Sequence, residues 1–360
     1  LYSIPQINLI MKKFSYIEIL RLFTSLAVVI FHYAHFFYPY NSFYDPELVI
    51  EGNNFPFFFI LELVYNYGRY GVEMFWAISG FVFAHVYLDQ LKKISSKEFL
   101  INRIARLYPL HLLTLIIVAG LQLLSLKING NFEIHKVNDL YHFVLNLFYI
   151  HGWGMAEAFS FNAPTWSVSI ELIVYGIFFI SIVLLNKFRI KFIILIYIFL
   201  LLVDKYWDIK TFYLTSFFDC CRLFFSGILM HYLYIEIKNK FYLILISIIL
   251  MFVSWIGSFK LFIFFPAIIL FFSAFGTITN KKLGTFFQLS GDLTYALYLL
   301  HTPTQIMIIL IFGYFNIKED IFFSEYFFLG YISFVIFISF ISFKYFEKPL
   351  NYKLRRILKK

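Results

Sequence analysis

The chain has 360 residues, of which 61% are hydrophobic and only 14% are charged, and its mean hydropathy is +0.79. This composition excludes a soluble globular protein and predicts a polytopic integral membrane protein of the all-α class. The net charge of +9 does not indicate nucleic-acid binding, because the basic residues lie in short loops between apolar runs, where they orient membrane spans. The two cysteines, Cys220 and Cys221, are adjacent, so we expect neither a disulfide framework nor a bound metal.

Ten apolar runs have roughly the length of transmembrane helices. They cover residues 16–38, 70–89, 106–126, 166–186, 191–203, 213–234, 241–257, 261–278, 289–312 and 326–344. A shorter apolar run at 139–151 is expected to be interfacial or re-entrant rather than spanning. With this choice both termini fall on one side of the membrane, together with most of the 30 Lys and Arg residues. The excess predicts a bundle of about ten transmembrane helices with both termini in the cytoplasm.

The sequence shows no long linker, so we expect one membrane domain at residues 11–349 and a basic cytoplasmic tail at 350–360. Residues 1–10 precede Met11, and two lysines follow that methionine, as at a natural start ahead of a first span. We therefore interpret residues 1–10 as a mis-called or non-native start.

The first apolar run carries the ionisable side chains Glu18, Arg21, His32 and His35. Such groups are costly inside a membrane and by default mark function. Arg21 and His32 are eleven residues apart, about three helical turns, so they share one helix face with His32 about 16 Å further along the axis. This spacing predicts a cation near one membrane surface and a titratable base deeper in. The alternative is that His32 is a hydrogen-bonded interior side chain.

Three other predicted helices bring charged groups to the depth expected for His32. These groups are Glu73, Glu171, Asp219 and Arg222. A carboxylate near a histidine orients the ring and stabilises its charged form, which suits a general base. The alternative is a network of buried ion pairs that only fixes helix packing.

Arg103 and Arg106 precede the third apolar run on its predicted cytoplasmic side. They are three residues apart, so they share a face if this segment is helical. Arginine suits phosphate because its planar fork binds bidentately, although two arginines at this place are also what the positive-inside rule predicts. Together with the deeper groups, they suggest a phosphate-bearing donor at the cytoplasmic face.

Short motifs recur here in an order that resembles a known family, the membrane acyltransferases of acyltransferase family 3. The motifs are Arg21-(ten residues)-His32, Gly71–Phe81 ending in Ser79-Gly80-Phe81, Arg103-x-x-Arg106-x-x-Pro109, Trp166-Ser167-x-x-x-Glu171 and Thr294-Tyr295-x-x-Tyr298-x-x-His301. The resemblance covers almost the whole chain. It departs at Phe75-Trp76, where the family usually has Phe-Phe, and at Val168, where it often has Leu.

The resemblance implies an O-acyltransferase that moves an acyl group, usually acetyl, from acyl-CoA to a hydroxyl of a saccharide or lipid-linked glycan. It implies His32 as the general base, and we expect Glu73 or Glu171 to orient or charge that histidine. Arg21, Arg103 and Arg106 are the expected donor-binding residues. The expected acceptor-binding residues are Asp219, Arg222, Trp166 and Ser167. The expected location is the bacterial inner (cytoplasmic) membrane, and the expected partners are acyl-CoA, the glycan and membrane lipid.

Several alternatives stay open at this stage. A transporter or flippase for a lipid-linked sugar also needs intramembrane charges, but the inverted repeats and broken helices typical of transporters are not found. We interpret His301 as a core histidine bonded to Tyr298 or a backbone carbonyl, with a place in the same site as the alternative. Lipopolysaccharide O-antigen, capsule, peptidoglycan and small glycosides are all possible acceptors. The sequence also leaves open whether the acyl group is acetyl or longer. It does not decide between direct transfer and an acyl-histidine intermediate, and it leaves the oligomeric state open.

Overall fold

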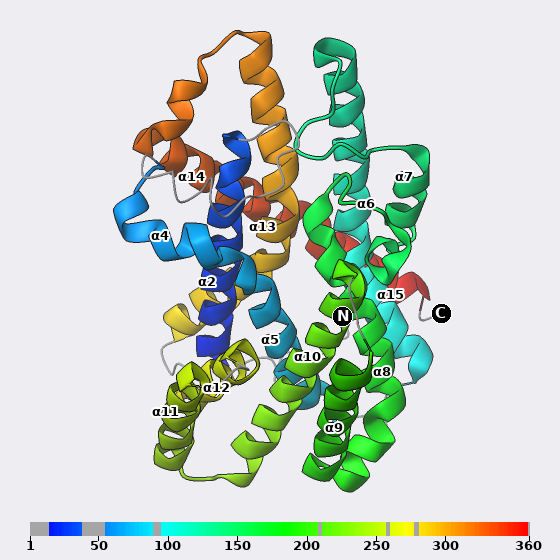
Figure 1. Ribbon diagram of the computed structural model, residues 1–360, viewed down its shortest axis with the longest axis vertical. Coiled ribbons are helices and arrows are strands. Elements are labelled where there is room, and N and C mark those ends of the chain that lie inside the picture. The colour runs from blue at the N-terminus through cyan, green and yellow to red at the C-terminus, as the bar shows by residue number, and fades with distance from the viewer. Residues whose placement is uncertain are drawn as a thin grey trace. The chain divides into compact units, whose positions relative to one another are not determined.

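A computed structural model of the chain describes residues 14–37, 55–88, 95–207, 211–256, 260–276 and 281–358. Every regular element within these ranges is a helix, as the predicted all-α class requires. The α-helices are α2 (Ser15–His32), α4 (Phe58–Tyr67), α5 (Gly71–Tyr87), α6 (Ser96–Asn129), α7 (Leu140–Leu147), α8 (Trp166–Phe188), α9 (Ile190–Tyr206), α10 (Phe212–Glu236), α11 (Lys240–Ile256), α12 (Lys260–Phe275), α13 (Lys281–Tyr314), α14 (Glu325–Ser342) and α15 (Lys348–Leu358) (Figure 1).

Each of the ten predicted runs overlaps one of these helices, but the lengths differ, and α6 and α13 extend beyond their runs at both ends. Among the described residues, six segments are long and apolar enough to cross a membrane: Ser15–Phe36, Ser96–Asn129, Ala163–Phe188, Phe212–Glu236, Lys282–Tyr314 and Glu325–Leu358. The remaining helices, α5, α9, α11 and α12, have 16 or 17 residues. At 1.5 Å per residue they reach about 26 Å, slightly short of a hydrocarbon core of about 30 Å. The chain is therefore a multi-pass membrane protein by its helices, while ten spans and cytoplasmic termini stay predictions.

Of the two segments predicted at the ends of the chain, the structure describes only the C-terminal one. Residues 1–10 lie outside the described residues. The basic tail expected at 350–360 lies largely within α15, whose last turn carries Arg355 and Arg356.

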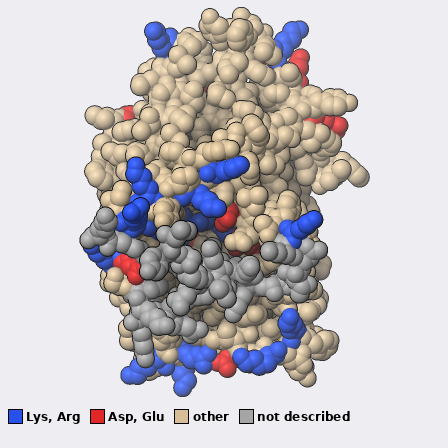
Figure 2. All heavy atoms as spheres, turned by 180° about the vertical axis from the view of Figure 1, so that it is seen from behind, with Lys and Arg blue, Asp and Glu red and all other residues tan. Residues whose placement is uncertain are grey.

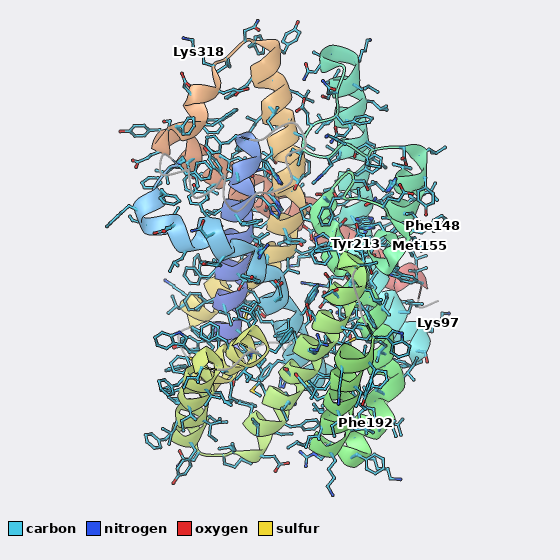
Figure 3. The ribbon with its side chains drawn as sticks, viewed as in Figure 1. Lys97, Phe148, Met155, Phe192, Tyr213 and Lys318 are labelled. Atoms are coloured by element: carbon cyan, nitrogen blue, oxygen red, sulfur yellow. The ribbon has the colours of Figure 1, made fainter. Side chains whose placement is uncertain are left out.

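The run 139–151 folds as expected for a segment that does not span. It forms α7, an eight-residue helix of about 12 Å, followed by the short π-helical turn η4 (His151–Met155). Asp139 caps α7, because its carboxylate accepts a hydrogen bond of 2.8 Å from the backbone N–H of His142. Phe148 and Met155 on this segment are exposed (Figure 3).

The chain divides into two compact units by its contacts. Unit 1 comprises Leu1–Thr24, Val72–Ser96 and Ile170–Asp292, and unit 2 comprises Ser25–Gly71, Lys97–Ser169 and Leu293–Lys360. The division passes through α2, α8 and α13, so each of these helices contributes to both units. The predicted single membrane domain at residues 11–349 stays a prediction.

Unit 1 is built on close helix packing, with α11 and α12 side by side (Figure 1). In this unit α5 and α10 approach backbone to backbone at two glycines. A Cβ at Gly80 would collide with the carbonyl of Phe224, and a Cβ at Gly227 would collide with the carbonyl of Ala77. Such crossings at small residues are typical of membrane helices. Gly80 is thus explained by packing between these two helices.

Many large apolar side chains point outward rather than into the bundle. Trp255 and Ile256 at the end of α11 are each 76% exposed, and Phe337 in α14 is 58% exposed. Figure 2 shows one face in which uncharged residues cover most of the described surface, while Lys and Arg gather in a few groups. Apolar surface of this extent is rare on soluble monomers and is what a lipid-facing surface requires.

Candidate functional site

His32 lies where the first long helix changes its winding. The predicted helix was one continuous run over 16–38, whereas α2 ends at His32 and the 3-10 turn η2 (Tyr33–Phe36) follows. Arg21 and His32 are both in α2, so their spacing places them on one face as predicted. His35 belongs to η2, with three residues per turn, and is therefore not on the α-helical stripe expected for it. The His32 side chain is half-buried.

The side chain that directly contacts the His32 ring is another histidine. His301 Nε2 lies 3.1 Å from His32 Nδ1, and the two ring centroids are 4.9 Å apart with their planes 23° apart. His301 is fully buried, and its Nδ1 lies 3.2 Å from the Leu297 carbonyl oxygen. The expectation of a backbone-bonded core histidine is thus confirmed, but the same ring also belongs to the surroundings of His32.

Gln305, one turn further along α13, holds the backbone of His32. Its amide Nε2 donates a hydrogen bond of 2.6 Å to the His32 carbonyl oxygen. This carbonyl lies where α2 passes directly into the 3-10 turn η2. Gln305 is fully buried, so it is a fixed cap on the end of α2.

Two further imidazoles extend the pair into a histidine cluster, which we define as His32, His35, His135 and His301. The His35 ring centroid is 5.1 Å from that of His32, and that of His135 is 6.1 Å from that of His35. His135 lies in the 130–139 loop outside the helices. Burial lowers the pKa of His135 to about 3, helped by the charge of His35, so this ring is neutral at physiological pH.

A buried carboxyl holds the loop that carries His135. The Glu133 carboxylate accepts hydrogen bonds from Ser125 Oγ at 2.8 Å and from Asn129 Nδ2 at 2.9 Å. Gln122 bonds both backbone groups of Glu133, each at 2.9 Å. Burial raises the pKa of Glu133. These bonds to α6 hold Ile134 at φ +62°, a strained value for a β-branched residue.

The Thr294-Tyr295-x-x-Tyr298-x-x-His301 motif joins α13 to several elements of unit 2. Ser25 Oγ of α2 donates to the Thr294 carbonyl at 3.4 Å, and Tyr295 donates to the Leu107 carbonyl of α6 at 2.6 Å. Tyr298 donates to the Pro164 carbonyl, just before α8, at 2.6 Å. Each motif residue therefore fixes α13 against a different neighbour, and His301 is the one that contacts the candidate base.

The predicted acceptor residues Trp166 and Ser167 lie at the start of α8. Ser167 Oγ lies 2.8 Å from the Tyr298 hydroxyl and donates to the Pro164 carbonyl at 3.2 Å. Ser167 is buried and Trp166 is half-buried. These contacts give Ser167 a structural role in joining α8 to α13, while acceptor binding by either residue stays a prediction.

His151 is a second neutral histidine of unit 2. Because the Thr165 hydroxyl donates to the Asn162 carbonyl at 2.8 Å, it accepts from His151 Nε2, which lies 3.0 Å away. Burial, with a smaller effect of His111, lowers the pKa of His151 to about 3. The ring is therefore an uncharged donor at neutral pH.

The charged candidates of unit 1 form ion pairs within single helices. Arg21 contacts Glu18 at 2.8 Å in α2, and Arg222 contacts Asp219 at 2.7 Å in α10. Arg222 also lies over the Phe262 ring, 5.5 Å from its centroid. Both pairs have the i,i+3 spacing that brings side chains together on a helix surface.

The two predicted carboxylates, Glu73 and Glu171, also belong to unit 1. Glu171 is 7% exposed and lies near enough to Cys220 of α10 to act on it electrostatically. Glu73 is half-buried in the first turn of α5. Because His32 belongs to unit 2, the convergence of these carboxylates on it stays a prediction.

Arg103 and Arg106 lie in α6, which begins ten residues before the predicted span because its polar first turns continue as helix. The condition for a shared face is therefore met. Both side chains are half-buried. Figure 3 shows Lys97 in the first turn of this helix.

Three residues in or around the histidine cluster escaped the sequence analysis: Gln305, His135 and Glu133. Gln305 follows His301 by four positions, so the helical spacing of a buried polar pair was an available signal. His135 gave none, because a histidine in a polar loop is unremarkable before the chain folds. Glu133 was hidden for the same reason. In the described part of the chain, no group of three His, Cys, Asp or Glu side chains is arranged to hold a metal ion.

Comparison with known proteins gives one match. A family model described as an acyltransferase domain matches residues 14–343, which is nearly the whole chain. No curated protein and no solved structure was found to match the sequence. The match spans both units and includes every predicted site residue.

Proposed function

Since the chain belongs to acyltransferase family 3, matched over residues 14–343, we propose that this membrane acyltransferase moves an acyl group from acyl-CoA to a saccharide hydroxyl. The family match carries the reaction class. The proposed acyl group is acetyl, the proposed acceptor is a saccharide or lipid-linked glycan, and the proposed location is the bacterial inner membrane.

His32 is the proposed general base. It is half-buried at the end of an apolar helix, so it is accessible to a substrate while most of its surroundings exclude water. His32 Nε2 takes the proton of the acceptor hydroxyl as the hydroxyl oxygen attacks the thioester carbonyl. The new C–O bond forms, the C–S bond breaks, and the proton leaves with the CoA thiolate to give the free thiol. Glu73 or Glu171 is proposed to favour the charged ring.

Arg21, Arg103 and Arg106 are the proposed donor-binding residues. Arg103 and Arg106 lie on one face of α6, where two guanidinium forks suit the phosphates of CoA. Asp219, Arg222, Trp166 and Ser167 are the proposed acceptor-binding residues.

Membranes that contain the full chain test this proposal with labelled acetyl-CoA. We expect label in the glycan fraction, and a loss of about 10²–10⁴-fold in the His32→Gln variant. Arg103→Lys/Arg106→Lys should raise the apparent KM for acyl-CoA, because lysine keeps the positive charge but lacks the bidentate fork. Protein level and membrane insertion are measured for each variant. Transfer that is unchanged in His32→Gln would overturn the assigned base. Purified protein that cleaves no acyl-CoA but moves glycolipid across liposomes would support a transporter instead.

A further inference from the structure

The contacts of His301 determine which of its nitrogens carries a proton. Its Nδ1 faces the Leu297 carbonyl oxygen at 3.2 Å, and a carbonyl oxygen only accepts hydrogen bonds. His301 Nδ1 is therefore the protonated nitrogen of the neutral ring. His301 Nε2 then has a lone pair and can only accept.

The protonated nitrogen of His32 follows from its contact with His301. His301 Nε2 lies 3.1 Å from His32 Nδ1, so His32 Nδ1 carries the proton and donates it. In the neutral His32 ring the remaining nitrogen, Nε2, then has the lone pair. A base must present a lone pair to its substrate, and the tautomer of a histidine is set by the hydrogen bond that its other nitrogen makes.

Burial makes this arrangement rigid. His301 and Gln305 are both fully buried and are four residues apart, so they share one face of α13. His301 bonds the ring of His32, and Gln305 bonds its backbone carbonyl at 2.6 Å. Tyr331 of α14 donates to the His301 carbonyl at 3.4 Å. His32 is thus held at two points by one helix.

We propose that His301 is a positioning residue that keeps the proton of the neutral His32 ring on Nδ1 and thereby presents Nε2 as the basic nitrogen. When Nε2 takes a proton from the acceptor, the Nδ1–H of the imidazolium stays bonded to His301, and no proton moves to His301. The catalytic consequence rests on the proposed function, whereas the tautomer is a property of the folded chain alone.

Nitrogen-15 NMR of the full chain in lipid nanodiscs, labelled at histidine, tests the tautomer. The His32 signals are those that disappear in His32→Gln. We expect a protonated Nδ1 and an unprotonated Nε2 in the parent protein. His301→Gln, whose amide oxygen can accept, should retain this pattern, whereas His301→Phe, which keeps the ring shape without an acceptor, should shift part of the population to the other tautomer.

Steady-state kinetics on the same preparations tests the consequence. We expect kcat to fall about 10–100-fold in His301→Phe, the usual effect of losing a positioning partner, with KM for the donor within about two-fold. His301→Gln should recover most of kcat, and Gln305→Met should give a smaller loss. Thr302→Val is the matched control, because Thr302 is buried beside His301 and its hydroxyl has no hydrogen-bond partner among the described residues.

The outcomes distinguish the positioning role of His301 from the proposed acyltransferase function. A parent protein with its His32 proton on Nε2 would overturn the positioning role, even if the His301 variants fail to fold. So would a His301→Phe variant with the parent tautomer and the parent kcat. If the parent tautomer is as expected but no acyl transfer occurs, the tautomer assignment is supported and the proposed function falls.

Discussion

The two units satisfy their intramembrane polar groups in different ways. In unit 1 the ion pairs Glu18–Arg21 and Asp219–Arg222 each join residues three apart on one helix. In unit 2 the contacts of His32 join residues 269 and 273 positions apart. A local pair forms as soon as its helix forms, whereas the His32 contacts exist only in the folded bundle. These two ion pairs are thus local, whereas the imidazole of His32 is placed by tertiary structure.

Removing one member of a local pair gives the largest expected effect on stability. Arg222 is 8% exposed, so Asp219→Asn leaves a buried guanidinium without its nearest carboxylate. We expect a loss of about 3 kcal/mol, as for other broken buried pairs. Thermal unfolding measured with a thiol-reactive fluorophore reports it, because Cys220 and Cys221 are both buried.

The control for this variant replaces both charges. In Asp219→Asn/Arg222→Met much of the stability should return, because both charges of the pair are removed together. Equal losses in the single and double variants would show that the pair is not the cause and that unit 1 does not balance charge locally.

A smaller effect is expected where unit 1 relies on packing rather than charge. Gly80→Ala places a Cβ against the Phe224 carbonyl, which forces α5 and α10 apart and costs about 1–3 kcal/mol. The same thermal assay measures the loss. Gly176→Ala is the control, because a Cβ at Gly176 meets nothing within 4 Å. Equal stability of the Gly80 and Gly176 variants would contradict the close crossing.

The smallest effect is an acid sensitivity of unit 2. His151 has a pKa of about 3 in the folded chain and an ordinary value near 6.5 when unfolded. Between these values the unfolded chain binds more protons, so stability is complete above about pH 6.5 and declines as the pH falls. At pH 6 the loss from this group should be below about 1 kcal/mol.

Thermal unfolding at pH 8 and pH 6 measures the loss of stability on acidification. His151→Gln removes the part of that loss that comes from protonation of His151. We expect the stability at pH 8 and at pH 6 to differ less in the variant than in the parent. An unchanged difference would mean that His151 does not titrate as a buried neutral ring.

Whether a feature could be predicted depends on how far apart in the sequence the interacting residues are. Apolar runs determine membrane helices by local composition, so each of the ten predicted runs overlaps a helix among the described residues. The length of α6 was not predicted, because its polar first turns gave no sign of continuing the helix. Asp219 and Arg222 were found as candidates because charged side chains stand out in an apolar run, but their ion pair was not predicted. The contacts of His32 depend on the way α2 and α13 pack, which no local pattern encodes. For the same reason the sequence favoured a core role for His301 and left its place in the His32 site as the alternative.

The long separation between His32 and its partners has a consequence for synthesis. His32 leaves the ribosome 269 residues before His301. At about 5–20 residues per second, roughly 15–50 s pass before the second imidazole exists. During that time the end of α2 has neither its cap nor its ring partner. A truncated product or a stalled ribosome therefore carries the first helix without these partners of His32, and the site is complete only once the last sixth of the chain is being made.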